Sequence, residues 1–111
     1  MSDFSFTKKE RICRYSEFKA LYTKGEKRDT EHFFIFMCPN GLAWRRLGIT
    51  VSKKIGTAVN RNHVKRLVRE YFRLHKNHFP ESCDILFVAK PGSHSLKYYD
   101  LCEELNPVLR A

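Results

Sequence analysis

The sequence lacks the patterns by which membrane, secreted and metal-binding proteins are usually recognised. No run approaches the roughly 18–20 apolar residues of a membrane span, and Met1-Ser2-Asp3-Phe4 does not begin a secretory signal, so neither is expected. The cysteines form no CxxC pair and no Cys/His pair with zinc spacing; they are Cys13, Cys38, Cys83 and Cys102. We expect free thiols in a reducing compartment, and hence a cytoplasmic protein.

Motifs of self-sufficient hydrolases are also absent. The chain has no DxD, HExxH or GxSxG motif and no glycine-rich phosphate loop. Glu103 and Glu104 are neighbours on a predicted helix, so their side chains diverge. His75 and His78 have i, i+3 spacing and could share an ion, but they lack a third ligand nearby, so a basic helix end is the better interpretation. We expect no catalytic residue and no metal site in the protein itself.

What the sequence does contain is positive charge. Among its 111 residues, 21 Lys and Arg face 12 Asp and Glu, which gives a formal net charge of +9. This length suits one domain, residues 1–111, and a hydrophobic content of 42% indicates a globular one. An excess of cations of this size predicts an anionic partner, most commonly nucleic acid.

The positive charge concentrates between residues 51 and 80, where Glu70 is the only acid. On a helix with 100° per residue, one arc is apolar and consists of Val64, Leu67, Val68, Tyr71 and Phe72. Asn62 falls in the middle of the adjoining arc, which is cationic. The cations of the whole segment are Lys53, Lys54, Arg61, Lys65, Arg66, Arg69, Arg73 and Lys76. An ordinary solvated helix mixes charge signs, so this helix, expected to run to about Leu74, is predicted to bind polyphosphate.

The whole chain predicts an α+β sandwich of order α-β-β-α-β-α, with helices packed on a small sheet. A flexible basic arm, residues 1–14, comes first. The elements expected after it are a short helix from Ser16 to Gly25, a charged loop over 26–31, strands over 32–38 and 47–52, the basic helix, a strand over 84–89, and a helix that starts at Ser95 and ends before Pro107.

Aromatic side chains could complete a reader of single-stranded RNA, because exposed rings stack on unpaired bases with about 1–3 kcal/mol each. The candidates are Phe18, Tyr22, Phe33 and Phe36. Burial in the core is the alternative for each ring, and for Phe18 and Tyr22 both interpretations stay open. We assign Phe34 to the core. Strand alternation places Phe33 and Phe36 on opposite faces without deciding which one meets RNA.

The segment Val51–Val59, followed by Arg61-Asn62-His63-Val64-Lys65-Arg66-Leu67 and Arg69, resembles the signature of the bacterial ribonuclease P protein subunit. That family has Arg-Asn-Arg-x-Lys-Arg after a Ser-Arg/Lys-Lys strand end. The resemblance covers about residues 10 to 106. It includes the helix of Phe18 and Tyr22, Gly25, the aromatic strand, Leu47-Gly48 and Ala89-Lys90-Pro91-Gly92.

One position departs from the family pattern. His63 stands where the family usually has the second Arg. On the helical wheel it lies between the basic and apolar arcs. We therefore expect that its effect is limited to one RNA contact or one packing interaction, and that the cationic arc remains.

The resemblance implies an α/β fold with an unusual left-handed β-α-β crossover. It also implies the RNA-binding subunit of ribonuclease P, which removes the 5′ leader of precursor tRNA by endonucleolytic cleavage. The hydrolysis is expected in the RNA subunit with its Mg²⁺, with one protein per RNA and no activity of the protein alone. The implied RNA-binding residues are Lys53, Lys54, Arg61, Asn62, Lys65, Arg66 and Arg69, with Arg73 from the same cationic arc; the leader cleft would use Phe18, Tyr22 and Phe36, with Phe33 as a further candidate.

Two other classes remain open. A ribosomal-protein-like RNA binder would share the charge and the fold class, but it would show no preference for ribonuclease P RNA. A DNA-binding regulator would need a second helix placed for helix-turn-helix docking, and the apolar strands that flank the basic helix argue against one.

Overall fold

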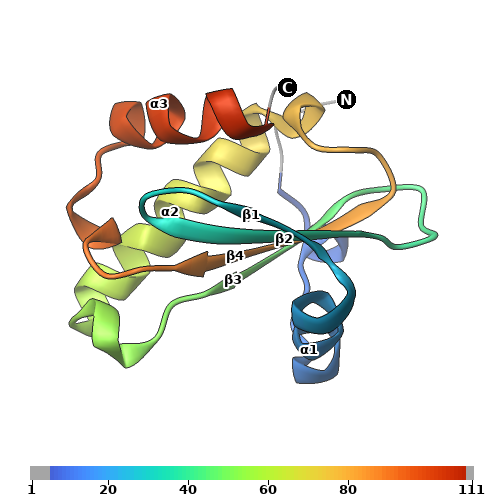
Figure 1. The fold of residues 1–111 in the computed structure, drawn as a ribbon, viewed down its shortest axis with the longest axis horizontal. Helices are drawn as coiled ribbons and strands as arrows, with labels where there is room; N and C mark the ends of the chain where they lie inside the picture. The colour runs from blue at the N-terminus through green and yellow to red at the C-terminus, as the bar shows by residue number, and fades with distance from the viewer. Residues whose placement is uncertain (1–5, 110–111) are drawn as a thin grey trace.

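The computed structural model describes residues 6–109 and is built in three layers (Figure 1). A four-stranded sheet lies in the middle. Helix α1 (Tyr15–Lys24) covers one face, and helices α2 (Ala58–Leu74) and α3 (Tyr98–Leu109) cover the other. None of the helices in this range is long and apolar enough to cross a membrane.

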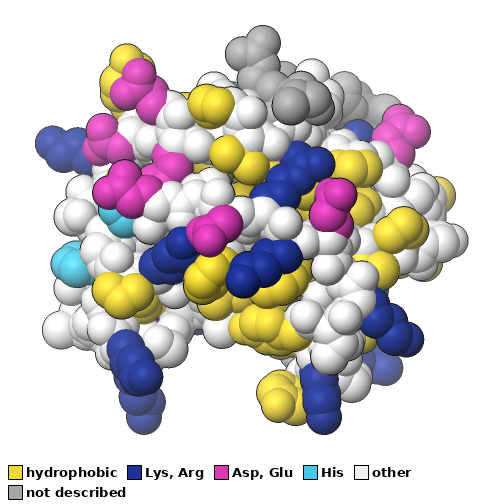
Figure 2. All heavy atoms as spheres, viewed as in Figure 1, with side chains coloured by type: hydrophobic (Ala, Val, Ile, Leu, Met, Phe, Trp, Pro, Cys, Tyr) yellow, Lys and Arg dark blue, Asp and Glu magenta, His cyan; other side chains and the backbone are white. Residues whose placement is uncertain are grey.

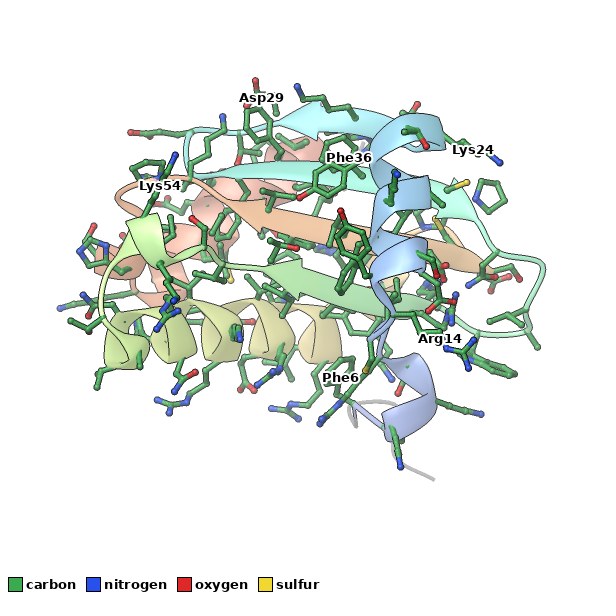
Figure 3. All side chains as sticks on the ribbon, turned by 90° about the horizontal axis from the view of Figure 1, so that it is seen from below. Phe6, Arg14, Lys24, Asp29, Phe36 and Lys54 are labelled. Carbon is green, nitrogen blue, oxygen red and sulfur yellow. The ribbon has the colours of Figure 1, made fainter. Side chains whose placement is uncertain are left out.

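The sheet has the order β1-β2-β4-β3. Its strands are β1 (Glu26–Asp29), β2 (Phe33–Pro39), β3 (Arg46–Thr50) and β4 (Cys83–Ala89). Strand β4 pairs antiparallel with β2 and parallel with β3, and α2 connects the parallel pair. Seen from the α2 side with β3 and β4 pointing up, β4 lies to the left of β3, so the crossover is left-handed (Figures 1 and 3). The fold class implied by the resemblance is confirmed, against the usual right-handed preference.

The main core lies between the sheet and α2. Strand alternation directs Phe33, Ile35 and Met37 of β2 into this core. Helix α2 contributes the whole predicted apolar stripe, Val64, Leu67, Val68, Tyr71 and Phe72, and each of these side chains is buried. The prediction of an amphipathic helix that ends at Leu74 is confirmed.

A smaller core holds α1 on the opposite face of the sheet. It consists of Ile12, Leu21, Phe36 and Leu86. Helix α1 can approach β3 closely because residue 48 is glycine: a Cβ at Gly48 would lie 2.4 Å from Cε1 of Phe18. An ion pair adds a polar tether, since Nη2 of Arg46 lies 2.9 Å from Glu17 of α1 and 2.7 Å from Asp84 of β4.

Three predicted elements need correction. The expected charged loop contains strand β1, which pairs with β2 over Glu26–Asp29, so the order is α-β-β-β-α-β-α. This strand was not predicted because its residues are charged. An edge strand exposes its side chains, so it need not have the apolar pattern of a buried strand. Helix α3 neither starts at Ser95, which lies in a separate 3₁₀ turn, nor ends before Pro107; it runs from Tyr98 to the buried Leu109. Lys53 and Lys54 lie in a 3₁₀ turn (Lys53–Ile55) and not at a strand end.

The segment expected as a flexible arm contacts the domain in the residues that the structure describes. Phe6 packs edge-on against Phe72, with ring centroids 5.5 Å apart. The backbone N–H of Ile12 donates to the carbonyl oxygen of Leu47 at 2.9 Å, which covers part of the β3 edge. Phe6 and Ile12 thus attach this segment to the domain through apolar contacts that its basic composition did not suggest. Residues 1–5 of the expected arm lie outside the described residues.

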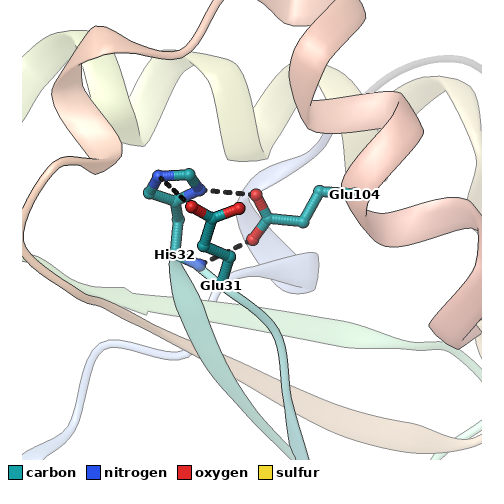
Figure 4. A group of neighbouring side chains, drawn as sticks. All are labelled: Glu31, His32 and Glu104. Atoms are coloured by element: carbon teal, nitrogen blue, oxygen red, sulfur yellow. Dashed lines mark hydrogen bonds and ion pairs between the residues drawn. The ribbon is translucent and has the colours of Figure 1, made fainter.

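Glu104 fastens α3 to the turn between β1 and β2 (Figure 4). Its Oε2 accepts hydrogen bonds from the Thr30 hydroxyl at 2.6 Å and the His32 backbone N–H at 2.7 Å. Its Oε1 lies 2.6 Å from Nδ1 of His32, whose Nε2 lies 3.9 Å from Glu31. Glu31, His32 and Glu104 are metal-ligand types, but both Glu104 oxygens are engaged in this tether.

The tether makes stability depend on pH. Burial by itself would raise the pKa of Glu104, but hydrogen bonds from His32 and Thr30 outweigh it and hold this pKa below its ordinary value of 4.5. A carboxyl group whose pKa is lowered in the folded state contributes its full stabilisation at pH values above its pKa in the unfolded state. That contribution is lost as the pH falls below 4.5 through the folded-state value.

We predict that Glu104→Gln lowers the free energy of unfolding at pH 7 by about 1.5–3 kcal/mol, because charged hydrogen bonds are replaced. The substitution should also remove part of the decline in stability below pH 4.5. Urea unfolding at several pH values measures both effects. The exposed neighbour Glu103→Gln is the control and should change stability by no more than about 0.5 kcal/mol. Equal losses in both variants would contradict the tether.

We predict that Gly48→Ala destabilises the protein by about 1–3 kcal/mol, because the new methyl group collides with the Phe18 ring. Thermal or urea unfolding measures the loss. In a Phe18→Ala background the collision partner is gone, so the same Gly48→Ala change should cost much less. Identical costs in the two backgrounds would show that α1 does not depend on the glycine.

Candidate nucleic-acid interface

The start of α2 is built to expose two lysines beside a helix N-terminus. Ile55 is buried and anchors the 3₁₀ turn, while Lys53 and Lys54 stay exposed. Gly56 has φ +144, a value that L side chains rarely adopt, and so permits the sharp entry into the helix. Thr57 then caps α2 by accepting from the backbone N–H of Asn60 at 3.2 Å. The lysine charges therefore lie near the positive end of the helix dipole.

The remaining predicted RNA-binding residues follow along α2. Asn62, Arg66 and Arg69 are exposed, and Arg61, Lys65 and Arg73 are half-buried. We call these side chains the basic face: Lys53, Lys54, Arg61, Asn62, Lys65, Arg66, Arg69 and Arg73. The buried apolar stripe fixes the rotation of α2, so the basic face is held away from the core.

Charge is distributed unevenly over the molecule. Figure 3 places Lys54 and Phe6 at opposite ends of α2, which runs beside the β3 edge of the sheet with charged side chains projecting outward. Acidic side chains gather instead over α3, which carries Asp100, Glu103 and Glu104 (Figure 2). A polyanion is thus attracted to the α2 side and repelled from the α3 side.

Two side chains of this region have structural roles. His63 points to the loop before α3, where its Nε2 lies 3.0 Å from the carbonyl oxygen of Leu96. Its position matches the expected packing interaction. Lys76 does not belong to the basic face, because it lies beyond α2 and forms a 2.7 Å ion pair with the buried Glu10.

On the other face of the sheet, α1 and β2 bring aromatic rings together. The ring centroids of Tyr22 and Phe36 lie 5.1 Å apart, in an edge-on contact. Tyr22 is 45% exposed, whereas Phe36 is 8% exposed and belongs to the smaller core. Phe18 is half-buried and lies over Gly48. Phe18, Tyr22 and Phe36 are therefore grouped as predicted, with Tyr22 the most open of the three.

Phe33 must be removed from the predicted cleft. It is fully buried in the main core, with its ring centroid 5.6 Å from that of Phe87. Phe34, which we assigned to the core, instead lies on the α1 face and is half-buried. Nζ of Lys27 and Nζ of Lys90 lie 4.3 Å and 4.2 Å from the centre of its ring. We call Phe18, Tyr22, Phe34 and Phe36 the aromatic surface.

Strand alternation in the sequence could have predicted that Phe34, and not Phe33, lies on the face of Phe36. Residues i and i+2 of a strand share a face, so a strand that directs Phe36 toward α1 must direct Phe34 there as well. The role of Phe6 had no such signal. Its contact with Phe72 joins segments far apart in the chain, and no local pattern in the basic N-terminal stretch predicts it.

Beside α2 lies a cavity of about 320 Å³. We call it the α2 pocket; it is lined by Phe6, Asn62, Arg66, Arg69, Glu70 and Arg73. Glu70 receives a forked contact from Arg73, with Nε 3.1 Å from Oε1 and Nη2 2.9 Å from Oε2. The hydrogen bond to Glu70 raises the pKa of Arg73 above its ordinary value, so this guanidinium stays charged. The pocket thus combines cations with one carboxylate, one amide and one aromatic ring.

The chain is similar over nearly its whole length to characterised proteins. Residues 6–111 match the family model described as Ribonuclease P. The ribonuclease P protein component of Syntrophus aciditrophicus is 45% identical over 109 residues, which are 98% of this chain and 92% of that protein. The corresponding component of Desulfovibrio desulfuricans is 47% identical, over 90% of this chain and 80% of that protein.

Solved structures agree with the sequence matches. The RNase P protein of Staphylococcus aureus superposes with a TM-score of 0.82 at 35% identity, over 91% of this chain and 93% of that one. The RNase P protein from Thermotoga maritima gives a TM-score of 0.81 at 30% identity, over 91% and 96% of the two chains. The chain therefore belongs to the ribonuclease P protein family, the protein component of a tRNA-processing endoribonuclease.

Proposed function

We propose that this chain binds the catalytic RNA of ribonuclease P through the basic face and the single-stranded 5′ leader of precursor tRNA through the aromatic surface. In this way it promotes Mg²⁺-dependent removal of the leader in the cytoplasm, as one protein per RNA. One observation carries the proposal: the eight polar or cationic side chains of the basic face lie on α2 and the turn before it, beside β3, and four aromatic side chains of α1 and β2 lie on the other side of the sheet.

The basic face suits a folded RNA. Arg side chains fork onto phosphate oxygens, Lys side chains add point charges, and the free N–H groups at the start of α2 can donate to a phosphate. Asn62 can bond a phosphate, a sugar or a base edge. Each phosphate that is neutralised releases counterions, so this contact should be strong at low salt and weaken as salt rises.

The aromatic surface suits unpaired nucleotides. Single-stranded RNA is bound where bases stack on aromatic rings while cations follow the backbone. Tyr22 offers the most open ring, and Phe34 adds a ring between two lysines, Lys27 and Lys90. With Phe34 in place of Phe33, all four rings lie on one face of the sheet.

The chain's own groups support binding and leave hydrolysis to the RNA and its Mg²⁺. Glu70, the one carboxylate of the basic segment, pairs with Arg73 and belongs to no group of three metal-ligand side chains among the described residues. Cations beside two RNAs reduce the repulsion between them and hence the Mg²⁺ needed to assemble them. Only the substrate carries the leader, so binding energy on the leader favours the substrate over the product.

Reconstitution tests the proposal. The chain is mixed with a bacterial ribonuclease P RNA at low Mg²⁺, and cleavage of a precursor tRNA with a leader is followed. The proposal requires that the chain increase cleavage by the RNA and be inactive alone. If the chain binds RNA without changing cleavage, it is a general RNA binder of the ribosomal-protein kind.

We predict that Lys65→Ala with Arg66→Ala weakens binding to the catalytic RNA and flattens its salt dependence. The slope of log affinity against log salt should fall by about 0.7–0.9 for each phosphate that the variant no longer neutralises. A salt titration measures the slope. Lys24→Ala on α1 removes an exposed charge on the other side of the sheet and should leave the slope close to that of the wild type. An unchanged slope in the double variant would refute the assignment.

We predict that Phe18→Ala weakens binding of precursor tRNA by the holoenzyme but not binding of mature tRNA, because only the precursor carries the leader. Removal of one stacking ring corresponds to about 1–3 kcal/mol. Tyr99→Ala removes an aromatic ring that is 70% exposed on α3 and should affect neither tRNA. Equal losses for precursor and mature tRNA would place Phe18 outside the leader contact.

A further inference from the structure

Glu70 occupies an unexpected place for an acidic side chain. It is the only Asp or Glu between residues 51 and 80, and it lines the α2 pocket together with Arg66, Arg69 and Arg73. Its side chain is 44% exposed. A carboxylate at this place repels phosphate, so a pocket made for phosphate alone is weakened by it. The chemistry of the pocket therefore indicates a ligand that carries hydrogen-bond donors as well as negative charge.

The carboxylate has acceptor capacity left after its contact with Arg73. Two carboxylate oxygens offer about four lone-pair sites, and the fork from Arg73 uses one on each oxygen. The same fork fixes the carboxylate in position. The lone pairs that remain lie on the outer sides of the two oxygens and point away from each other, so two adjacent donors meet this carboxylate by converging on the outer side of one oxygen.

Among the four RNA bases, guanine alone presents two adjacent donors on its Watson–Crick edge, N1–H and the N2 amino group. Adenine and cytosine place an acceptor next to their amino group, and uracil places its single N–H between two carbonyl oxygens. RNA-binding proteins commonly read the Watson–Crick edges of unpaired bases while they stack the rings on aromatic or guanidinium planes.

The other lining groups match the rest of a guanine nucleotide. Phe6 supplies an apolar wall and is held in place by its contact with Phe72. Arg66 and Arg69 are exposed and can contact the phosphate, and Asn62 can bond the base or the sugar. The volume of about 320 Å³ lies at the lower end of ligand pockets, which span about 300–1,000 Å³.

We propose that the α2 pocket binds one unpaired guanine of the RNA partner, with Glu70 accepting from N1–H and N2 and with Phe6 and the arginines enclosing the nucleotide. This inference rests on the proposed RNA-binding function and adds a base preference to it. Glu70 is the specificity-determining residue of the pocket. The N-terminal segment is then part of the RNA site, because it provides Phe6.

The simpler interpretation is that Glu70 only neutralises Arg73. The two interpretations predict opposite results for Glu70→Gln. If Glu70 is only a counterion, its replacement removes a negative charge from the pocket and increases the affinity for every nucleotide equally. Loss of a base reader decreases the affinity for guanine and leaves the other three bases unaffected or slightly favoured.

The test is a titration of the full chain with GMP, AMP, CMP and UMP, the four ribonucleoside 5′-monophosphates, followed by NMR shifts of the α2 amides. The wild type should bind GMP about tenfold more tightly than the others, as expected for one bidentate base contact. Glu70→Gln should abolish this preference. Glu70→Asp keeps the charge but withdraws the carboxylate, so it should also lose the preference, whereas a counterion role predicts little change.

Glu103→Gln is the matched control, since it is an exposed glutamate on α3 and should keep the preference. Equal affinities of the wild type for the four nucleotides, no binding of any of them, or a uniform gain in Glu70→Gln would overturn the inference. Reconstituted cleavage separates this failure from that of the proposed function. If the chain still stimulates cleavage, the function stands and only the guanine pocket is rejected.

Discussion

The structure depends above all on the packing of one amphipathic helix against the sheet. Val64, Val68, Tyr71 and Phe72 are fully buried, and Leu67 nearly so. Burial of these side chains offsets the repulsion among the cations beside them, which would disfavour so basic a helix in isolation. The left-handed crossover places this helix next to the edge strand β3. The basic face therefore lies at the β3 edge of the sheet, next to the face that α1 covers.

Small packing details position the aromatic surface. Gly48 lets Phe18 lie close to β3, and Arg46 joins α1 to β4 through Glu17 and Asp84. The position of the aromatic surface is thus set partly by residues that do not belong to it. The N-terminal segment has a comparable role on the other side, where Phe6 closes one wall of the α2 pocket.

Polar tethers away from the basic face and the aromatic surface hold α3 and the segment before α1. Glu104 connects α3 to the β1–β2 turn, and Glu10 connects the N-terminal segment to Lys76. For Glu10, burial would raise the pKa, but hydrogen bonds from Lys76 and Thr7 hold it below its ordinary value. Both acids are therefore used in the fold. The exposed acids Asp100 and Glu103 lie on α3, whereas Glu70 is the one acid between residues 51 and 80.

The sequence by itself determined the features that depend on short-range periodicity. The apolar stripe and cationic arc of α2 follow from the helical repeat, and the strands β2 and β4 follow from their aromatic and β-branched residues. The family resemblance supplied the crossover.

Only the tertiary structure decided which face of β2 meets α1. Strand alternation fixes which side chains share a face, but not which of the two faces points toward α1. It was therefore the structure that placed Phe34 and Phe36, and not Phe33, on the face that α1 covers. The same holds for the strand Glu26–Asp29, the docking of Phe6 and the helical Pro107, since each is stabilised by partners distant in the chain.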